Sequence, residues 1–139
     1  MGNTQSIKKI NFEDMQTVVK NSEMYLIINT LELNEQNCLI LGTLNANEEE
    51  QTINNLLKNN INVQIIVYGK NCNDETAIKK YNQLLSIGFY NVLLYNGGLF
   101  EWILLQDIYG DDLFPTTKKE KDILKFKPIK QLHFGLLTN

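Results

Sequence analysis

The stretch IIVYGKNCNDETA, residues 65–77, joins a hydrophobic run to a short polar loop and then to the beginning of a helix. A continuous apolar run is typical of a strand that is buried on both faces of a parallel sheet. The loop that follows such a strand can hold an anion, because backbone N–H groups and the helix dipole meet there. The same place lowers the pKa of a thiol. Because Cys72 lies in this loop, the stretch predicts either a working nucleophile or a site that has lost its chemistry.

The segments on both sides continue the alternation of strand and helix. We expect strands at residues 7–12, 23–30, 62–68 and 91–95, a further short apolar run at 37–47, and helices at 11–20, 47–60, 74–89 and 96–110. The first helix begins with a capping-box pattern, with Asn11 as N-cap and Asp14 three residues later. The alternation predicts an α/β fold, in which helices cover a mostly parallel sheet and residues 62–68 form the central strand.

The composition is that of one compact domain. With 139 residues, 43% of them hydrophobic, the chain can bury a single core. A formal net charge of -3 and a pI near 5.1 argue against a nucleic-acid partner. The two cysteines form no CxxC motif and no set of metal ligands with His133, so we expect a reducing compartment, no metal and no cofactor. Cys38, beside an apolar run, is expected to be a small buried hydrophobic residue.

Three parts are expected along the chain. Residues 1–6 form an N-terminal acylation segment, residues 7–110 the domain, and residues 111–139 a C-terminal extension that packs on the domain and has a partly flexible end. The extension holds both prolines and a lysine cluster. No run reaches the roughly 18 apolar residues of a membrane span, and the N-terminus lacks the apolar region of a secretory signal.

The order of motifs resembles the rhodanese-like family. The match covers about residues 7–106 and rests on four pieces: YLIIN (25–29), CLILGTLNAN (38–47), IIVYG (65–69) and IGFYNVLLYNGGLFEW (87–102). The last piece is the most specific, because it has the family's spacing of Gly88, Phe89, Gly97, Gly98 and Trp102. The resemblance implies a parallel sheet of about five strands with helices on both faces. It also implies a sulfurtransferase site in the loop after the central strand.

This sequence departs from the family's site at each charged position. The family's nucleophilic cysteine directly follows the central strand, where this chain has Gly69, and Asn29 and Leu31 replace an Asp and an Arg at the end of the earlier strand. The family's arginine before the next helix would hold an anion by charge, whereas residues 73–76 include two acids. The active-site-like loop comprises Gly69, Lys70, Asn71, Cys72, Asn73, Asp74, Glu75 and Thr76.

Cys72 remains an alternative nucleophile. It lies near a helix start and two residues from Lys70, both of which favour a thiolate, but Asp74 and Glu75 oppose one. If the protein is an enzyme, we expect a rhodanese-type sulfurtransferase or a thiol-redox enzyme that uses this displaced cysteine. Phosphatase chemistry is less supported, because it needs a cysteine and an arginine that are both placed to stabilise the transferring phosphoryl group.

The first six residues, MGNTQS, fit the pattern for N-myristoylation at Gly2, with Ser6 as the second marker. A single myristoyl chain binds membrane only marginally, with a constant of about 10⁴ M⁻¹. Lys8 and Lys9 could add electrostatic attraction to an anionic leaflet. We therefore expect a cytoplasmic protein that associates reversibly with a membrane surface. A viral or protist source, and a place in a virion if the source is viral, are compatible with the asparagine-rich composition.

The leading hypothesis is a catalytically inactive rhodanese-like binding or adaptor protein. Its recognition surface would be the loop at residues 69–76, with the turn before Gly97 beside it and a protein or small ligand as partner. Phe100 and Trp102 are expected to pack in the core, because they occur at helical spacing in an apolar segment. Tyr68 ends the central strand, where a tyrosine is usually half buried with a solvated hydroxyl.

Overall fold

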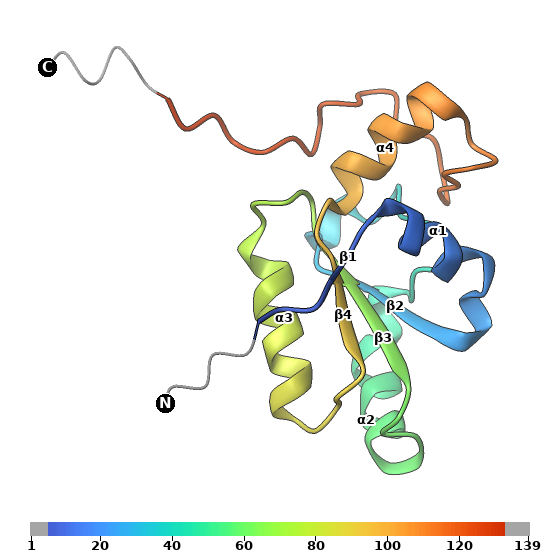
Figure 1. The fold of residues 1–139 in the computed structure, drawn as a ribbon, viewed down its shortest axis with the longest axis vertical. Coiled ribbons are helices and arrows are strands. Elements are labelled where there is room, and N and C mark those ends of the chain that lie inside the picture. The colour runs from blue at the N-terminus through green and yellow to red at the C-terminus, as the bar shows by residue number, and fades with distance from the viewer. Residues whose placement is uncertain (1–5, 133–139) are drawn as a thin grey trace, which may run out of the picture.

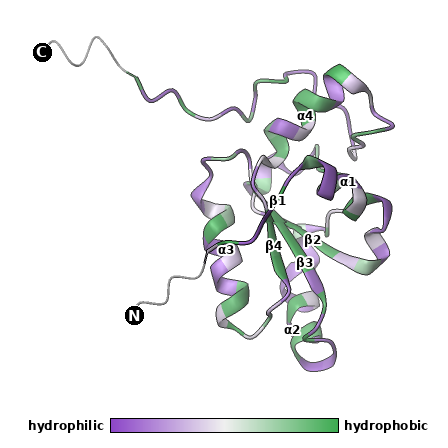
Figure 2. Cartoon of the chain, in the orientation of Figure 1, coloured by the Kyte–Doolittle hydropathy of each residue, from purple (hydrophilic) through white to green (hydrophobic). Residues whose placement is uncertain are grey.

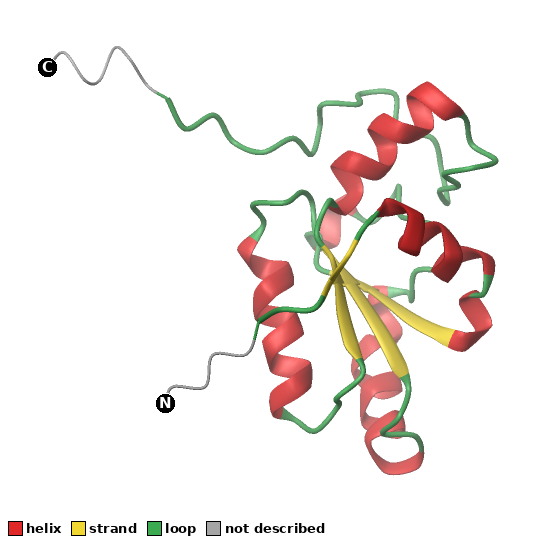
Figure 3. Ribbon diagram, viewed as in Figure 1, coloured by secondary structure: helices red, strands yellow, loops and turns green. Residues whose placement is uncertain are grey.

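The computed structural model describes residues 6–132 and contains one parallel sheet of four strands with helices around it (Figure 1). The strands lie in the order β1-β4-β3-β2. Their bounds are Lys9–Ile10 for β1, Tyr25–Asn29 for β2, Gln64–Tyr68 for β3 and Val92–Tyr95 for β4. The helices are α1 (Phe12–Lys20), α2 (Glu49–Asn59), α3 (Glu75–Ser86) and α4 (Gly98–Tyr109). Figure 3 shows the strands fanned side by side with the helices around them.

The predicted α/β fold is confirmed, with four strands where about five were expected. The apolar run at residues 37–47 forms no strand, because the chain turns at Gly42, whose φ is 94°. It forms two isolated bridges, one between Thr43 and Ile27 of β2 and one between Ile40 and Thr116 in the segment after α4. The first strand is also shorter than the expected residues 7–12, since only Lys9 and Ile10 pair with β4.

Strand β3 shows how the sheet separates two cores. Its alternate side chains point to opposite faces, as the pleat of a strand requires. Ile65 and Val67 pack in a cluster with residues of α2 and α3. Ile66 and Tyr68 pack in the other cluster, with residues of α1 and α4. Figure 2 shows the hydrophobic colour along the strands, which is expected for strands that are covered on both faces.

Local signals account for several of the helix boundaries. The capping box predicted for α1 is present, because Asn11 accepts from the backbone N–H of Asp14 and the Asp14 carboxylate accepts from the backbone N–H of Asn11.

Trp102 is fully buried, as expected, and its indole N–H donates to the carbonyl of Pro115 at 3.0 Å. Within residues 6–132, none of the helices has the length and apolar character needed to cross a membrane.

The segment after α4 returns to the domain and contributes to its core. Phe114 is buried against Trp102, with ring centroids 5.0 Å apart in an edge-to-face arrangement. The backbone then runs beside residues 39–41, where the N–H of Thr117 donates to the carbonyl of Leu39 at 2.8 Å. Farther along, Phe126 is also buried. The domain boundary at residue 110 stays a prediction, and Gly2 and His133 lie outside the described residues.

Candidate functional site

The loop between β3 and α3 is held against the beginning of α4. The backbone N–H of Leu99 donates to the carbonyl of Gly69 at 2.9 Å, and that of Phe100 donates to the carbonyl of Lys70 at 2.8 Å. Gly98 makes this contact possible. Its φ is +70°, and a Cβ atom on it would lie 2.7 Å from the backbone nitrogen of Asn71. The turn at residues 97–98 therefore lies beside the loop.

The Asp74 carboxylate fills the interior of the loop. One oxygen, Oδ2, accepts from the backbone N–H of Lys70 at 2.8 Å. The other, Oδ1, accepts from the backbone N–H of Thr76 at 3.0 Å and from the Thr76 hydroxyl at 2.6 Å. A loop of this kind directs backbone N–H groups inward and so favours negative charge. Here the negative charge comes from the loop's own side chain, which is also the N-cap of α3.

Gly69 and Asp74 fit each other closely. A Cβ atom added to Gly69 would lie 2.5 Å from Oδ2 of Asp74 and 3.0 Å from Oγ1 of Thr30. The first distance is far shorter than ordinary van der Waals contact, so any side chain at residue 69 would have to displace the carboxylate. The position that the resemblance assigns to the nucleophile is therefore open only to glycine while Asp74 keeps its hydrogen bonds.

Cys72 lies on the outside of the loop. Its side chain is exposed, and its hydrogen bond is to Oδ1 of Asn73, at a sulfur–oxygen distance of 3.8 Å. The Lys70 ammonium does not pair with this thiol, because it forms an ion pair with Glu35 at 3.2 Å. The loop amides of Lys70 and Thr76 are bonded to Asp74, so they do not surround the sulfur.

The remaining loop side chains serve the loop itself or face solvent. Asn71 accepts from the backbone N–H of Asn73 at 2.9 Å and donates to the carbonyl of Phe126 at 2.8 Å. Glu75 is exposed in the first turn of α3. Asn71 thus links the loop to the C-terminal segment, a contact between residues 55 positions apart that local sequence patterns do not reveal.

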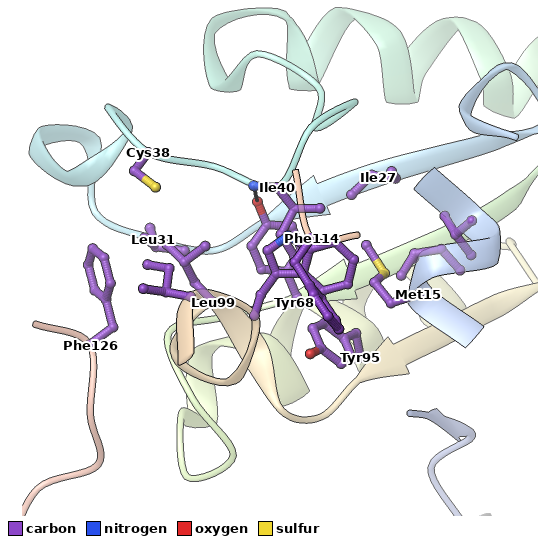
Figure 4. Close-up of a cluster of buried hydrophobic side chains, with 14 residues drawn as sticks. Met15, Ile27, Leu31, Cys38, Ile40, Tyr68, Tyr95, Leu99, Phe114 and Phe126 are labelled. Atoms are coloured by element: carbon purple, nitrogen blue, oxygen red, sulfur yellow. Dashed lines mark hydrogen bonds between the residues drawn. The ribbon is translucent and has the colours of Figure 1, made fainter. Parts of the chain in front are cut away.

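The end of β2 carries no charge toward the loop. Asn29 is buried and pairs with the Gln36 amide, which donates to Asn29 Oδ1 at 2.8 Å and accepts from Asn29 Nδ2 at 3.0 Å. Leu31, at the family's arginine position, belongs to the buried cluster that also contains Leu99 and Phe126. Figure 4 shows these three side chains near one another. An apolar contact therefore stands where the resemblance placed a cation.

The interpretation of Tyr68 was wrong. Its side chain is fully buried, and its hydroxyl accepts from the backbone N–H of Ile40 at 3.1 Å (Figure 4). The hydroxyl also lies 2.8 Å from the Thr43 hydroxyl. Burial raises the pKa of this phenol far above its ordinary value. Tyr68 thus holds the turn at residues 40–43 in place and does not line a pocket.

A groove that sequence reasoning missed borders the loop at Thr76. Its volume is about 740 Å³, and it lies between α2, α3 and the end of β2. The floor is apolar, with Ile53 and Leu84, while Lys79 and Lys80 stand on its α3 side. Lys80 pairs with Glu49 across the groove. No single motif marks such a groove, because its walls come from three separate segments of the sequence.

The family model described as "Rhodanese-like domain" matches residues 24–105. Among proteins with curated functions, none is significantly similar to this sequence.

Three solved structures illustrate the similarity in fold. The crystal structure of the Alr3790 protein from Anabaena sp. has a TM-score of 0.59 and 22% identity, over 79% of this chain and 92% of that one. Ygr203w, a yeast protein tyrosine phosphatase of the rhodanese family, has a TM-score of 0.62 and 13% identity, over 88% of this chain and all of that one. A variant of EanB in complex with ergothioneine has a TM-score of 0.58 and 17% identity, over 85% of this chain and 29% of that one.

At these identities the solved structures establish the fold, while the family model covers more than half of the sequence. Together with the parallel sheet, the loop after its central strand and the glycine turn that holds this loop, they show that the chain belongs to the rhodanese-like domain family.

Proposed function

We propose that this protein is a rhodanese-like binding module that does not carry out cysteine-dependent sulfur or phosphoryl transfer. The observation that carries the proposal is the Asp74 carboxylate inside the loop, bonded to the backbone N–H groups of Lys70 and Thr76. Thiosulfate, a persulfide and phosphate are all anions. Each would have to displace a carboxylate that already has its hydrogen bonds, and each would be repelled while that carboxylate stays.

The available cations also support a non-catalytic role. The 13 basic residues of the sequence are all lysines, so the bidentate guanidinium that suits an oxyanion is absent from the 139 residues. The lysine of the loop, Lys70, is paired with Glu35. Removing it from that pair to hold a substrate would leave the carboxylate without its cation.

The alternative function is a sulfurtransferase or thiol-redox activity that depends on Cys72. Its exposed sulfur is accessible to a substrate, which favours this function. The family includes enzymes, and two of the similar structures are a phosphatase and a protein bound to a sulfur-containing compound. Against this function, no backbone N–H group of residues 6–132 forms a hydrogen bond with the sulfur, and a persulfide there would rely on solvent for stabilisation.

The surface that the module offers a partner is the loop together with the groove beside it. Thr76 belongs to both, so a ligand in the 740 Å³ groove would contact the loop directly. The groove combines an apolar floor with polar walls, a combination typical of sites for small molecules or peptide side chains. A protein segment or a small ligand therefore fits this surface.

Reversible membrane association forms the second part of the proposal. The support is the MGNTQS pattern with Gly2 as acceptor and two exposed lysines, Lys8 and Lys9, close behind it. The protein would act at the cytoplasmic face of a membrane, as a peripheral protein. Intact-mass measurement after expression in a eukaryotic host tests this part, since loss of Met1 with one C14 acyl group is expected and a free Gly2 amine would contradict it.

Sulfur transfer is tested on the wild-type chain and on Cys72→Ser, with Cys38→Ser as the matched control. After incubation with thiosulfate, we expect no added sulfur atom by intact mass and the same background rate of thiocyanate formation from cyanide in all three proteins. Sulfur addition or turnover that is lost in Cys72→Ser and kept in Cys38→Ser would show that the protein is an enzyme that uses Cys72, and would contradict the proposed non-catalytic function.

A further inference from the structure

The C-terminal segment at residues 118–132, here called the strap, has an unusual distribution of side chains. It contains neither helix nor strand, and a single aromatic side chain, Phe126, is buried within it. Phe126 packs in the cluster of Leu31 and Leu99, and Asn71 donates to its carbonyl at 2.8 Å. The strap is therefore fixed at its middle to the domain, next to the candidate loop.

Ile123 is partly buried against the same cluster, whereas the three other large aliphatic side chains of the strap are exposed to solvent. The side chains of Leu124, Ile129 and Leu132 have exposed fractions of 53%, 79% and 63%. Lysines stand between them, at Lys125, Lys127 and Lys130 among others, and Figure 2 shows the resulting alternation of hydrophobic and hydrophilic residues along the segment.

The strap also holds most of the positive charge of a protein that is acidic elsewhere. Residues 118–132 contain six lysines and two carboxylates, a formal charge of +4. The rest of the sequence contains seven lysines and 14 carboxylates, a formal charge of -7. Among the residues that the structure describes, two lysines of the strap form ion pairs, Lys119 with Asp111 and Lys125 with Glu120. Lys118, Lys121, Lys127 and Lys130 have no carboxylate within ion-pair distance in that part of the chain.

We propose that the strap is a docking surface for an anionic lipid membrane. Exposed aliphatic side chains can enter the region between headgroups and acyl chains while neighbouring lysines contact lipid phosphates and carboxylates. The acidic remainder of the protein opposes this little, because the Debye length is about 8 Å at physiological ionic strength. The charge asymmetry instead orients the protein with its strap toward the membrane.

A membrane fits these side chains better than an acidic protein partner does. The centres of protein interfaces are depleted of lysine and enriched in aromatic residues. In the strap, lysines separate the aliphatic residues, and the aromatic Phe126 is turned into the domain. The inference builds on the membrane association proposed above, yet it concerns a different part of the chain and does not require the acyl group.

The experiment uses the full chain produced without an acyltransferase, so that Gly2 carries no lipid. Sedimentation with vesicles of phosphatidylcholine, with and without phosphatidylserine, measures the partition constant. We expect binding that depends on phosphatidylserine and weakens with salt. Lys127→Gln/Lys130→Gln should lower the partition constant about 25-fold, since each lysine near an anionic surface contributes a factor of about five. Ile129→Ser/Leu132→Ser should lower it as well, which pure electrostatics would not predict.

Matched controls carry the same changes elsewhere on the surface. Lys20→Gln/Lys58→Gln removes two other exposed lysines, and Met24→Ser/Ile108→Ser removes two apolar side chains with exposed fractions of 62% and 68%. Both control proteins should bind vesicles like the wild type.

Three results would overturn the proposal. The first is the absence of wild-type binding to vesicles with phosphatidylserine, and the second is an equal loss of binding in the control and strap variants. The third is retention on a polyglutamate resin without vesicle binding, which would assign the strap to an acidic protein. None of these results depends on acylation, so the proposal at Gly2 is judged separately by its intact mass.

Discussion

Asp74 shows how one residue can change the chemistry of a loop. It is the N-cap of α3, where a carboxylate stabilises the start of the helix. Its second oxygen reaches back to the backbone N–H of Lys70, and this contact requires that Gly69 has no side chain. A side chain at residue 69 would collide with the Asp74 carboxylate, while loss of the carboxylate would leave the N–H groups of Lys70 and Thr76 without their acceptor.

Replacing Gly69 by cysteine alone should not restore a persulfide site. The new Cβ atom would lie 2.5 Å from Oδ2 of Asp74, and such overpacking costs about 1–3 kcal/mol of stability. In Gly69→Cys/Asp74→Ala the carboxylate is gone, and the N–H groups of Lys70 and Thr76 can face the sulfur. We expect sulfur uptake from thiosulfate, measured by intact mass, in the double variant and not in the single one. Equal uptake by both variants would mean that Asp74 does not block the loop.

Among the secondary-structure elements, helix α4 holds the loop between β3 and α3 in place. Its first two backbone N–H groups after Gly98 donate to loop carbonyls, so the helix start and the loop move together. The strap adds a second restraint on the same loop through Asn71 and Phe126. The candidate site is thus shaped by the end of β3, by the start of α4 and by a segment that follows α4 in the sequence.

Gly98→Ala should destabilise the protein more than Gly110→Ala. Both glycines have positive φ, at +70° and +102°, and such a conformation costs an L-residue about 1–3 kcal/mol. A Cβ atom at Gly98 would also lie 2.7 Å from the nitrogen of Asn71, whereas one at Gly110 would meet nothing within 4 Å. We expect the collision to add about 1–3 kcal/mol to the loss in free energy of unfolding, measured by urea denaturation. Similar losses in the two variants would show that α4 can shift away from the loop without cost.

For the whole molecule, the two cysteines report on folding in different ways. Cys38 is buried, and burial raises the pKa of its thiol above the ordinary value of 9.0. Cys72 is exposed. Iodoacetamide should therefore modify Cys72 in the native protein and Cys38 only when the chain unfolds. Comparable rates at both sites under native conditions would contradict the packing of residues 38–40.

The raised pKa of Cys38 also determines how the free energy of unfolding changes with pH. The folded state holds the thiol proton more tightly than the unfolded state does. The contribution of this group to stability is thus complete below pH 9.0 and is lost as the pH rises through the higher folded value. Compared with Cys38→Ala, the wild type should lose more free energy of unfolding above pH 9.0 in urea denaturation. A parallel loss in the two proteins would mean that the thiol is not desolvated.

The sequence predicted what depends on local order and missed what depends on distant contacts. Apolar runs and caps were enough to locate the helices, the central strand and the buried Trp102. Tyr68 was misjudged, because its hydroxyl is bonded by residues 25–28 positions away along the chain. The groove beside Thr76 was missed for the same reason, since three distant segments form it.

The pairing of the first strand has a consequence for the order of events during synthesis. β1 is an edge strand whose neighbour in the sheet is β4, and Lys9 is in register with Leu94, 85 positions later. At about 5–20 residues per second, a ribosome needs about 4–17 s to cover that distance. During this interval β1 cannot pair, because β4 has not yet been synthesised. An enzyme that acts on Gly2 while the chain is being translated would therefore meet its substrate before folding could hide it.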